Sequence, residues 1–123
     1  SNIYSTDGFK VIARGRMPVN FRIYWDGDLC DELLDGTRIS KWNIEKNRCE
    51  TSIDFRELQP VSSCNGSKRT PSISADILGD WREEVILWDR ETASDLVLFT
   101  TTIPTSYCIP TLMHDPIYRM SIV

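Results

Sequence analysis

An acidic turn that occurs twice constrains the fold of this chain more than any other feature. The first copy is Gly27–Leu34 (GDLCDELL), and the second is Gly79–Ile86 (GDWREEVI). Both read glycine, aspartate, any two residues, an acid, glutamate and two aliphatic residues, and the copies lie 52 residues apart. Short apolar runs flank each copy. A repeat of about fifty residues with strands on both sides is typical of β-propeller blades, each of which is one small antiparallel sheet.

Segments rich in β-branched and aromatic residues predict an all-β fold, and no window shows a sustained helical period. Residues 18–60 and 72–113 are each expected to form one four-stranded antiparallel blade, separated by a loop at 59–71. Residues 1–15 would end a preceding blade, and residues 114–123 would begin a following one. The individual strands are expected at 3–4, 9–13, 21–25, 32–35, 38–43, 48–58, 73–78, 84–88, 95–101, 107–112 and 118–123.

Two blades cannot close a ring, because propellers have about four to eight blades of roughly 40–50 residues each. The 123 residues therefore predict a partial β-propeller, about two four-stranded blades with flanking strands. The open sheet edges would be covered either by the rest of a larger propeller or by self-association.

Composition bears on the class of partner. The net charge of −4 at pH 7 argues against nucleic acid, which binds to basic surfaces through its phosphates. No apolar run approaches the roughly 18 residues of a membrane-spanning helix, and no charged-then-apolar targeting signal is present, so no membrane partner is expected.

The chain has four cysteines, and they lack the spacing of a zinc site. They are expected to be free thiols, mostly buried, and a disulfide between Cys49 and Cys64 is the alternative. The cysteines are Cys30, Cys49, Cys64 and Cys108.

The acidic turns are candidate calcium sites, because Ca²⁺ prefers six to eight oxygen ligands of the kind that such turns supply. In the second copy the predicted ligands are Asp76, Asp80 and Glu84. In the first copy they are Asp26, Asp28 and Glu32, although Tyr24 stands where the second copy has Asp76. The alternative is that these acids only accept hydrogen bonds from backbone NH groups of solvated hairpin turns.

Two further polar clusters are candidate site elements. Residues 65–69 (NGSKR) form the only basic, glycine-containing loop, and it lies between the two predicted units. Its alternative interpretation is a tight turn with two exposed cations. His114 is the only histidine, and the HDP string at 114–116 could orient it in a site or simply form a turn.

Several long strings resemble one enzyme family. They are Asn20–Asp28 (NFRIYWDGD), Cys64–Lys68 (CNGSK), Ala75–Val85, Thr100–Pro104 and Thr111–Arg119 (TLMHDPIYR). These strings are similar to the C-terminal half of bacterial rhamnogalacturonan lyases of polysaccharide lyase family 11, and together they cover nearly the whole chain.

The resemblance implies a function. Members of this family are calcium-rich, eight-bladed propellers several times longer than this chain, and they cleave the pectin backbone rhamnogalacturonan I by β-elimination. The resemblance implies that Lys68 is catalytic and that Asn65, Gly66 and Ser67 contact substrate. Arg69, the next cation of the loop, is expected to assist in binding. The resemblance also supports calcium at the acidic turns. The sequence leaves the compartment unknown, and a secreted or periplasmic protein is favoured. An arginine and a tyrosine used by the family lie outside these residues.

Two functions of different classes remain open at this point. The first is a segment of a rhamnogalacturonan lyase that is inactive in isolation. The second is a calcium-stabilised β module that binds polysaccharide, or packs in a larger assembly, without catalysis. Release of an unsaturated uronate distinguishes the two, and His114 is the alternative catalytic base if Lys68 is not required.

Overall fold

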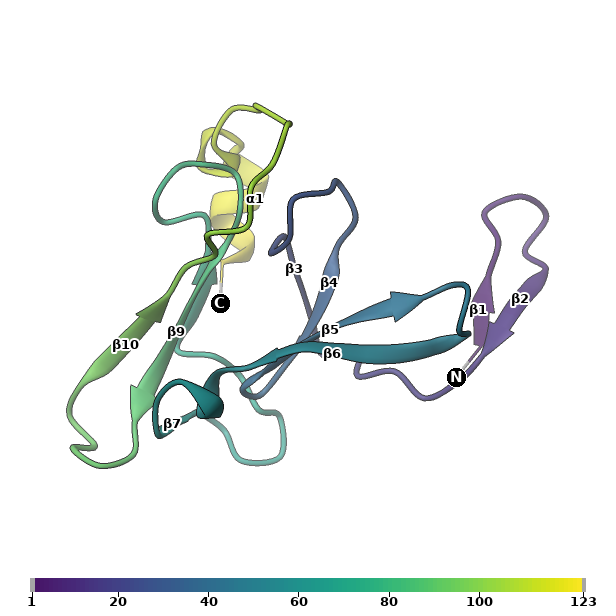
Figure 1. Cartoon of the computed structure of the whole chain (residues 1–123). Coiled ribbons are helices and arrows are strands. Elements are labelled where there is room, and N and C mark those ends of the chain that lie inside the picture. Colours follow the sequence, from purple (N-terminus) through teal and green to yellow (C-terminus); the bar gives the residue numbers. More distant parts are fainter. Residues whose placement is uncertain (1, 123) are drawn as a thin grey trace.

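The computed structural model describes residues 2–122, and its regular elements are mostly antiparallel strands (Figure 1). None of the helices in this range is long and apolar enough to cross a membrane. The elements in chain order are β1 (Asn2–Tyr4), β2 (Val11–Arg14), β3 (Phe21–Ile23), β4 (Glu32–Asp35), β5 (Arg38–Asn43), β6 (Arg48–Asp54), the 3₁₀ helix η1 (Phe55–Glu57), β7 (Val61–Ser62), β8 (Ile73–Ala75), β9 (Glu84–Asp89), β10 (Leu96–Phe99), the 3₁₀ helix η2 (Leu112–His114) and α1 (Pro116–Ser121).

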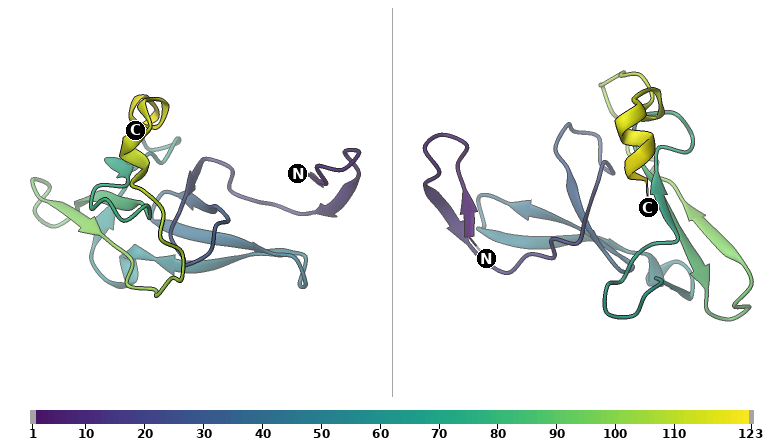
Figure 2. Two further views of the ribbon diagram at one scale, coloured as in Figure 1. Left: turned by 90° about the horizontal axis from the view of Figure 1, so that it is seen from above. Right: turned by 180° about the vertical axis from the view of Figure 1, so that it is seen from behind.

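The first large sheet follows the chain in the order β3-β4-β5-β6. The long β5–β6 hairpin reaches away from the rest of the protein toward the separate β1–β2 hairpin (Figures 1 and 2). The connection into β3 passes that long hairpin closely, since a Cβ on Gly15 would lie 2.7 Å from the Trp42 ring. The predicted N-terminal hairpin and the four strands of the first unit are present. The strands predicted at 21–25 and 48–58 are shorter than expected, because they end at Ile23 and Asp54 and Phe55–Glu57 form η1.

The second sheet is centred on β9. β10 pairs with one side of β9, while β7 and β8 pair with successive parts of its other side. The sheet thus has four strands, as expected, but its fourth strand is β7 from the predicted loop at 59–71. The strand predicted at 107–112 does not form, and β10 is the edge of this sheet within the described residues.

The two sheets repeat each other in register. Phe21 pairs with Leu34 and Ile23 with Glu32 across β3 and β4. At an offset of 52 residues, Ile73 pairs with Ile86 and Ala75 with Glu84 across β8 and β9. The repeated acidic turn therefore joins two structurally equivalent hairpins.

One hydrophobic core lies between the sheets, and non-equivalent faces meet there. The first sheet contributes Ile23, Leu34 and Ile39, and the second contributes Val85 and Leu87. At the 52-residue offset, Leu34 corresponds to Ile86, which lies on the opposite face of β9 from Val85 because side chains alternate along a strand. The sheets consequently stack head to tail. The face of the first sheet that carries Leu34 packs against the face of the second sheet that carries Val85, and these two faces are not equivalent in the repeat. Phe55 completes the core by stacking on Phe99, with ring centroids 4.3 Å apart.

The far face of the second sheet is apolar and partly exposed. It carries Ile73, Leu96 and Leu98, which are 38%, 65% and 43% exposed. These side chains share the face of Ile86, since Ile73 and Leu98 lie directly opposite it. This face of the second sheet is therefore only partly covered by the residues that the structure describes.

The C-terminal segment differs from the sequence-based expectation. Residues 118–122 were expected to begin a strand, but Pro116–Ser121 form the short helix α1; Val123, the last residue of the predicted strand, lies outside the described residues. Asp115 caps the helix by accepting a hydrogen bond from the Ile117 NH at 2.8 Å, and Pro116 occupies the first turn, where its missing NH is not needed. The Asp115 cap and Pro116 therefore favour a helix over a strand in this segment.

The predicted strand at 107–112 is wrong because its residues have other partners. The Thr111 hydroxyl and the Leu112 NH both donate to Asp76 Oδ2, at 2.6 and 2.8 Å. Upstream, the Thr105 hydroxyl donates to the Gly27 carbonyl at 2.7 Å. The segment thus runs across the two acidic turns instead of pairing with β10.

All four cysteines are free, as predicted, and the alternative disulfide between Cys49 and Cys64 is not formed. The expectation that they are mostly buried is wrong. Cys30 and Cys108 are exposed, and Cys49 and Cys64 are partly exposed. Burial of the Cys49 side chain still raises the pKa of its thiol.

Candidate functional site

The basic loop Asn65–Arg69 is a compact, exposed turn held by its own backbone. The NH groups of Lys68 and Arg69 donate to the Asn65 carbonyl at 2.7 and 3.1 Å. An antiparallel β-bridge, formed by the backbones of Cys64 and Thr70, closes the loop. Asn65 and Arg69 have positive φ angles of 50° and 51°. The Asn65 amide donates to the Thr70 hydroxyl at 2.8 Å. These contacts give a rigid loop from which the intervening side chains project.

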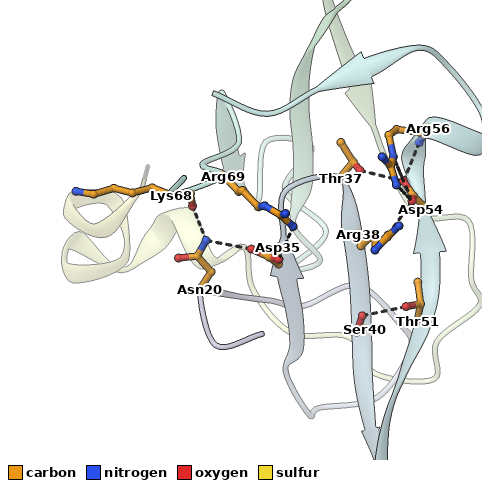
Figure 3. Close-up of polar contacts among 10 residues, drawn as sticks. All are labelled: Asn20, Asp35, Thr37, Arg38, Ser40, Thr51, Asp54, Arg56, Lys68 and Arg69. Atoms are coloured by element: carbon orange, nitrogen blue, oxygen red, sulfur yellow. Dashed lines mark hydrogen bonds and ion pairs between the residues drawn. The ribbon is translucent and has the colours of Figure 1, made fainter. Parts of the chain in front are cut away.

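The first sheet anchors this loop. The Gly36 NH donates to the Arg69 carbonyl at 3.3 Å, and the Arg69 guanidinium pairs with Asp35 at 3.2 Å. The Asn20 amide bridges Asp35 and the Lys68 carbonyl, as Figure 3 shows. Only the backbone of Lys68 is used, and its side chain extends away from these contacts (Figure 3). Within residues 2–122 the Lys68 ammonium has no hydrogen bond or ion pair, and it lines an open cavity of about 410 Å³ with Asn65, Gly66 and Ser67.

The glutamates of the two acidic turns have the same structural role. Glu32 Oε2 accepts hydrogen bonds from the NH groups of Trp25 and Asp26 at 2.8 and 3.1 Å. Glu84 Oε2 accepts from Ile77 and Leu78, each at 2.9 Å. Both carboxyl groups are almost fully buried. The backbone-capping role considered as the alternative to calcium is therefore present at both glutamates.

The first acidic turn brings three carboxylates together. Oxygens of Asp26, Asp28 and Glu32 lie within 4.8 Å of one another, so these residues could hold a metal ion. The Lys41 ammonium is centred on the same group, at 2.5, 2.6 and 2.8 Å from the three carboxylates. These hydrogen bonds outweigh burial and raise the pKa of Lys41. A lysine thus supplies the positive charge, and a metal ion would have to displace it.

The second acidic turn does not form a comparable cluster. Within the described residues, the three acids at 26, 28 and 32 are the only such group. Asp80 pairs with Arg82 at 2.9 Å, and Asp76 is held by residues 111–112. Burial raises the pKa of Glu84. Thr100 lies opposite Glu84, and its hydroxyl donates to Glu84 Oε1 at 3.2 Å. In the first sheet the equivalent position, opposite Glu32, is occupied by Lys41. Among residues 2–122 the buried Asp76 Oδ1 has no hydrogen-bond partner.

A tyrosine that sequence reasoning did not select joins the two repeats. The Tyr118 hydroxyl donates to Glu83 Oε1 at 2.7 Å and accepts from the Asp76 NH at 2.8 Å. Glu83 Oε2 accepts from the Tyr24 NH at 2.8 Å, so α1 is tied to both acidic turns. Burial raises the pKa of Tyr118. A contact between residues 35 positions apart leaves no local pattern in the sequence.

His114 lies away from the basic loop. It is an exposed residue at the end of η2 and lines a cavity of about 390 Å³ with Tyr24 and Tyr118, whereas Lys68 lines a different cavity. The HDP string forms the end of η2 and the cap of α1. The structure therefore separates the two candidate bases.

Comparison with known proteins identifies the family. The model described as "Rhamnogalacturonan lyase family 11, C-terminal domain" matches residues 1–123. The chain belongs to this family. It is similar to two proteins of Bacillus subtilis (strain 168), the rhamnogalacturonan endolyase YesW and the rhamnogalacturonan exolyase YesX, with 45% identity to each over 98% of this chain.

Solved structures agree with this family 11 assignment. The crystal structure of YesW covers 96% of this chain with a TM-score of 0.85 and 42% identity. The rhamnogalacturonan lyase PL11 of Bacillus licheniformis covers 81% with a TM-score of 0.74 and 48% identity. The chain spans only about a fifth of these relatives, 19% of YesW and 20% of YesX by sequence.

Proposed function

We propose that this family 11 domain is part of a rhamnogalacturonan lyase that cleaves rhamnogalacturonan I by β-elimination, and that it is inactive without the rest of the enzyme. The observation that carries the proposal is the Asn65–Arg69 loop. Its backbone is fixed from both sides, while the Lys68 ammonium is left without a partner in residues 2–122. Such a loop can present a lysine to a ligand with little loss of conformational freedom on binding.

The chemistry of elimination suits these side chains. A base must remove the proton next to the uronate carboxylate, and positive charge must stabilise the negative charge that then develops. In this proposal the Nζ atom of Lys68 accepts that proton. Asn65 and Ser67 would hold sugar hydroxyls, and Gly66 leaves open space, since nothing lies within 4 Å of a Cβ built on it.

The head-to-tail stack of the two sheets supports the proposal of a partial propeller. An interface between unlike faces can be repeated indefinitely, and it closes into a ring when the rotation between units allows. The open apolar face with Ile73, Leu96 and Leu98 would then be covered by the following blade. We therefore propose the rest of the propeller as the partner of this face, in preference to self-association.

The two acidic turns differ in how well their side chains suit the proposed calcium. The first turn has the clustered oxygens that Ca²⁺ prefers, but the single positive charge of Lys41 already offsets part of their negative charge. The second turn has a neutral threonine in place of that lysine and an unsatisfied Asp76 oxygen, but its acids are not clustered. Since pectin is an extracellular polymer, we further propose a secreted or periplasmic enzyme.

The test is the change Lys68→Ala in the full-length protein, assayed by the absorbance of the unsaturated uronate released from rhamnogalacturonan I. We expect turnover to be abolished, with folding and metal content unchanged, whereas Arg69→Ala mainly weakens binding. The matched control is Lys10→Ala, which removes an exposed lysine far from the loop and should leave turnover unchanged. A Lys68→Ala enzyme with near-normal kcat would move the base elsewhere, to His114 first. A full-length protein that binds the polymer without releasing unsaturated products would favour the non-catalytic β module.

A further inference from the structure

A second cavity lies on the other side of the basic loop, and it is lined by arginines. It has a volume of about 330 Å³ and is bordered by the β4–β5 turn, the start of β7 and the loop itself. Four of its lining residues are arginines, three carry hydroxyl groups and one is the glycine of the basic loop. They are Arg38, Arg56, Arg69, Arg90, Thr37, Ser62, Ser63 and Gly66.

Two of the arginines share one buried carboxylate. Arg56 binds Asp54 through its Nε and Nη2 atoms, the latter at 2.6 Å, and Arg38 Nε binds the same carboxylate at 2.8 Å (Figure 3). Arg56 and then Arg38 hold the pKa of Asp54 well below its usual range. Only Nε of Arg38 is used, so within residues 2–122 its two terminal nitrogens have no hydrogen-bond partner.

The other two arginines add charge to the same cavity. Arg69 pairs with Asp35 at 3.2 Å. Arg90 is positioned through its backbone, whose NH donates to the Pro60 carbonyl at 2.8 Å, and its guanidinium has no ion pair among residues 2–122. The cavity is thus lined by four arginines and one acid, Asp35, and Arg38 and Arg56 also pair with Asp54 beside it. This leaves a local excess of positive charge in a chain whose net charge is −4.

This excess favours an anionic guest of a particular shape. Guanidinium groups bind planar carboxylates in a fork-like geometry, and these hydrogen bonds are among the strongest in proteins. Thr37, Ser62 and Ser63 supply hydroxyl groups beside the arginines, which suits a sugar that carries a carboxylate. Gly66 lines both this cavity and the one that contains Lys68, so the two cavities adjoin across the loop.

We propose that the arginine-lined cavity binds the carboxylate of a second uronate of the polysaccharide, one rhamnose away from the uronate that reacts at Lys68. The proposal rests on the proposed function for the choice of substrate. It assigns Arg38 and Arg90 as the residues that contact this carboxylate, because their guanidinium nitrogens are the least occupied. Arg56 instead holds Asp54 and positions Arg38.

The direct test is binding of a short rhamnogalacturonan I oligomer to the full-length Lys68→Ala protein, measured by titration calorimetry. We expect the combined change Arg38→Gln and Arg90→Gln to weaken binding at least about tenfold, since each arginine makes charge-assisted hydrogen bonds. The matched control is Arg48→Gln, which removes an exposed arginine of β6 outside the cavity and should leave the affinity unchanged. A ligand test needs no variant of the cavity: the methyl ester of the oligomer should bind at least about tenfold more weakly than the acid.

The outcomes separate this inference from the proposed function. In the catalytically intact enzyme, loss of the subsite should raise KM for the polymer with little change in kcat. Release of unsaturated products with a normal KM in the double variant, together with equal binding of acid and ester, would overturn the subsite and leave the lyase intact. Arginine-dependent binding of the acid by a protein that releases no unsaturated product would support the subsite and refute the lyase.

Discussion

Replacing Lys41 by threonine tests whether a lysine takes the place of a cation in the first acidic turn. Threonine is the informative choice because Thr100 occupies the equivalent position opposite Glu84 in the second sheet. The change removes an ammonium that lies 2.5 to 2.8 Å from three carboxylate oxygens. It leaves those carboxylates clustered without a positive charge.

The expected cost lies between two limits. Exposed ion pairs contribute less than about 1 kcal/mol, and breaking a buried pair costs about 3–5 kcal/mol. Here the Glu32 side chain is 1% exposed, but those of Lys41 and Asp28 are 30% and 51% exposed. We therefore expect Lys41→Thr to lower the free energy of unfolding by about 2 kcal/mol in the presence of a chelator, as measured by urea titration.

Calcium should then restore the lost stability. An ion that binds only the folded state at 100 times its Kd stabilises it by about 2.7 kcal/mol. The variant should respond to calcium more strongly than the unaltered protein, because in the latter Lys41 competes for the same oxygens. Lys46→Thr is the matched control, since its exposed pair with Glu50 should contribute about 0.5 kcal/mol or less. The reasoning fails if Lys41→Thr unfolds at the same urea concentration as the unaltered protein in chelator, or if calcium stabilises both equally.

Three further changes test other parts of the structure. Asp54→Asn should lower the free energy of unfolding at pH 7. Because folding depresses the pKa of Asp54, the stability that its carboxylate contributes is present above the unfolded pKa of about 3.9 and is lost progressively as the pH falls below that value. Plots of unfolding free energy against pH for the variant and the unaltered protein should therefore converge in acid. Tyr118→Phe removes the hydroxyl that ties α1 to both acidic turns and should cost about 1–3 kcal/mol, with faster amide hydrogen exchange confined to the C-terminal segment. Gly27→Ala places a Cβ 2.5 Å from the Pro104 carbonyl oxygen and should lower the melting temperature markedly, whereas Gly66→Ala, with nothing within 4 Å, should melt as the unaltered protein does.

The repeat predicted the sheets well because short hairpins are determined locally. The acidic turn fixes where one strand ends and the next begins, and the 52-residue offset carries the same register into both sheets. Lys41 could also have been found, since the tight turn at Gly36 places it directly across from Glu32. The helix α1 could have been recognised from Asp115 followed by Pro116, a strong helix-start signal.

Other features depend on tertiary contacts and have no local signal. Residues 107–112 have enough apolar content for a strand, but Asp76 and the two acidic turns offer them better hydrogen-bond partners than the edge of β10 does. Strand β7 contains only Val61 and Ser62, which is too short for a periodic pattern to appear. The cavity arginines come from four separate segments of the chain, namely the start of β5, η1, the basic loop and the residue after β9, so only the tertiary fold brings them together.

The contact between unlike faces of the two sheets has a consequence for how repeat units can be added to such a protein in evolution. When one face of a unit is complementary to the opposite face of its neighbour, a duplicated unit of this length inherits both surfaces already matched. Gene duplication can therefore lengthen the array without the evolution of any new contact. After duplication each copy is free to diverge at positions outside that contact, as the lysine of one acidic turn and the threonine of the other have done.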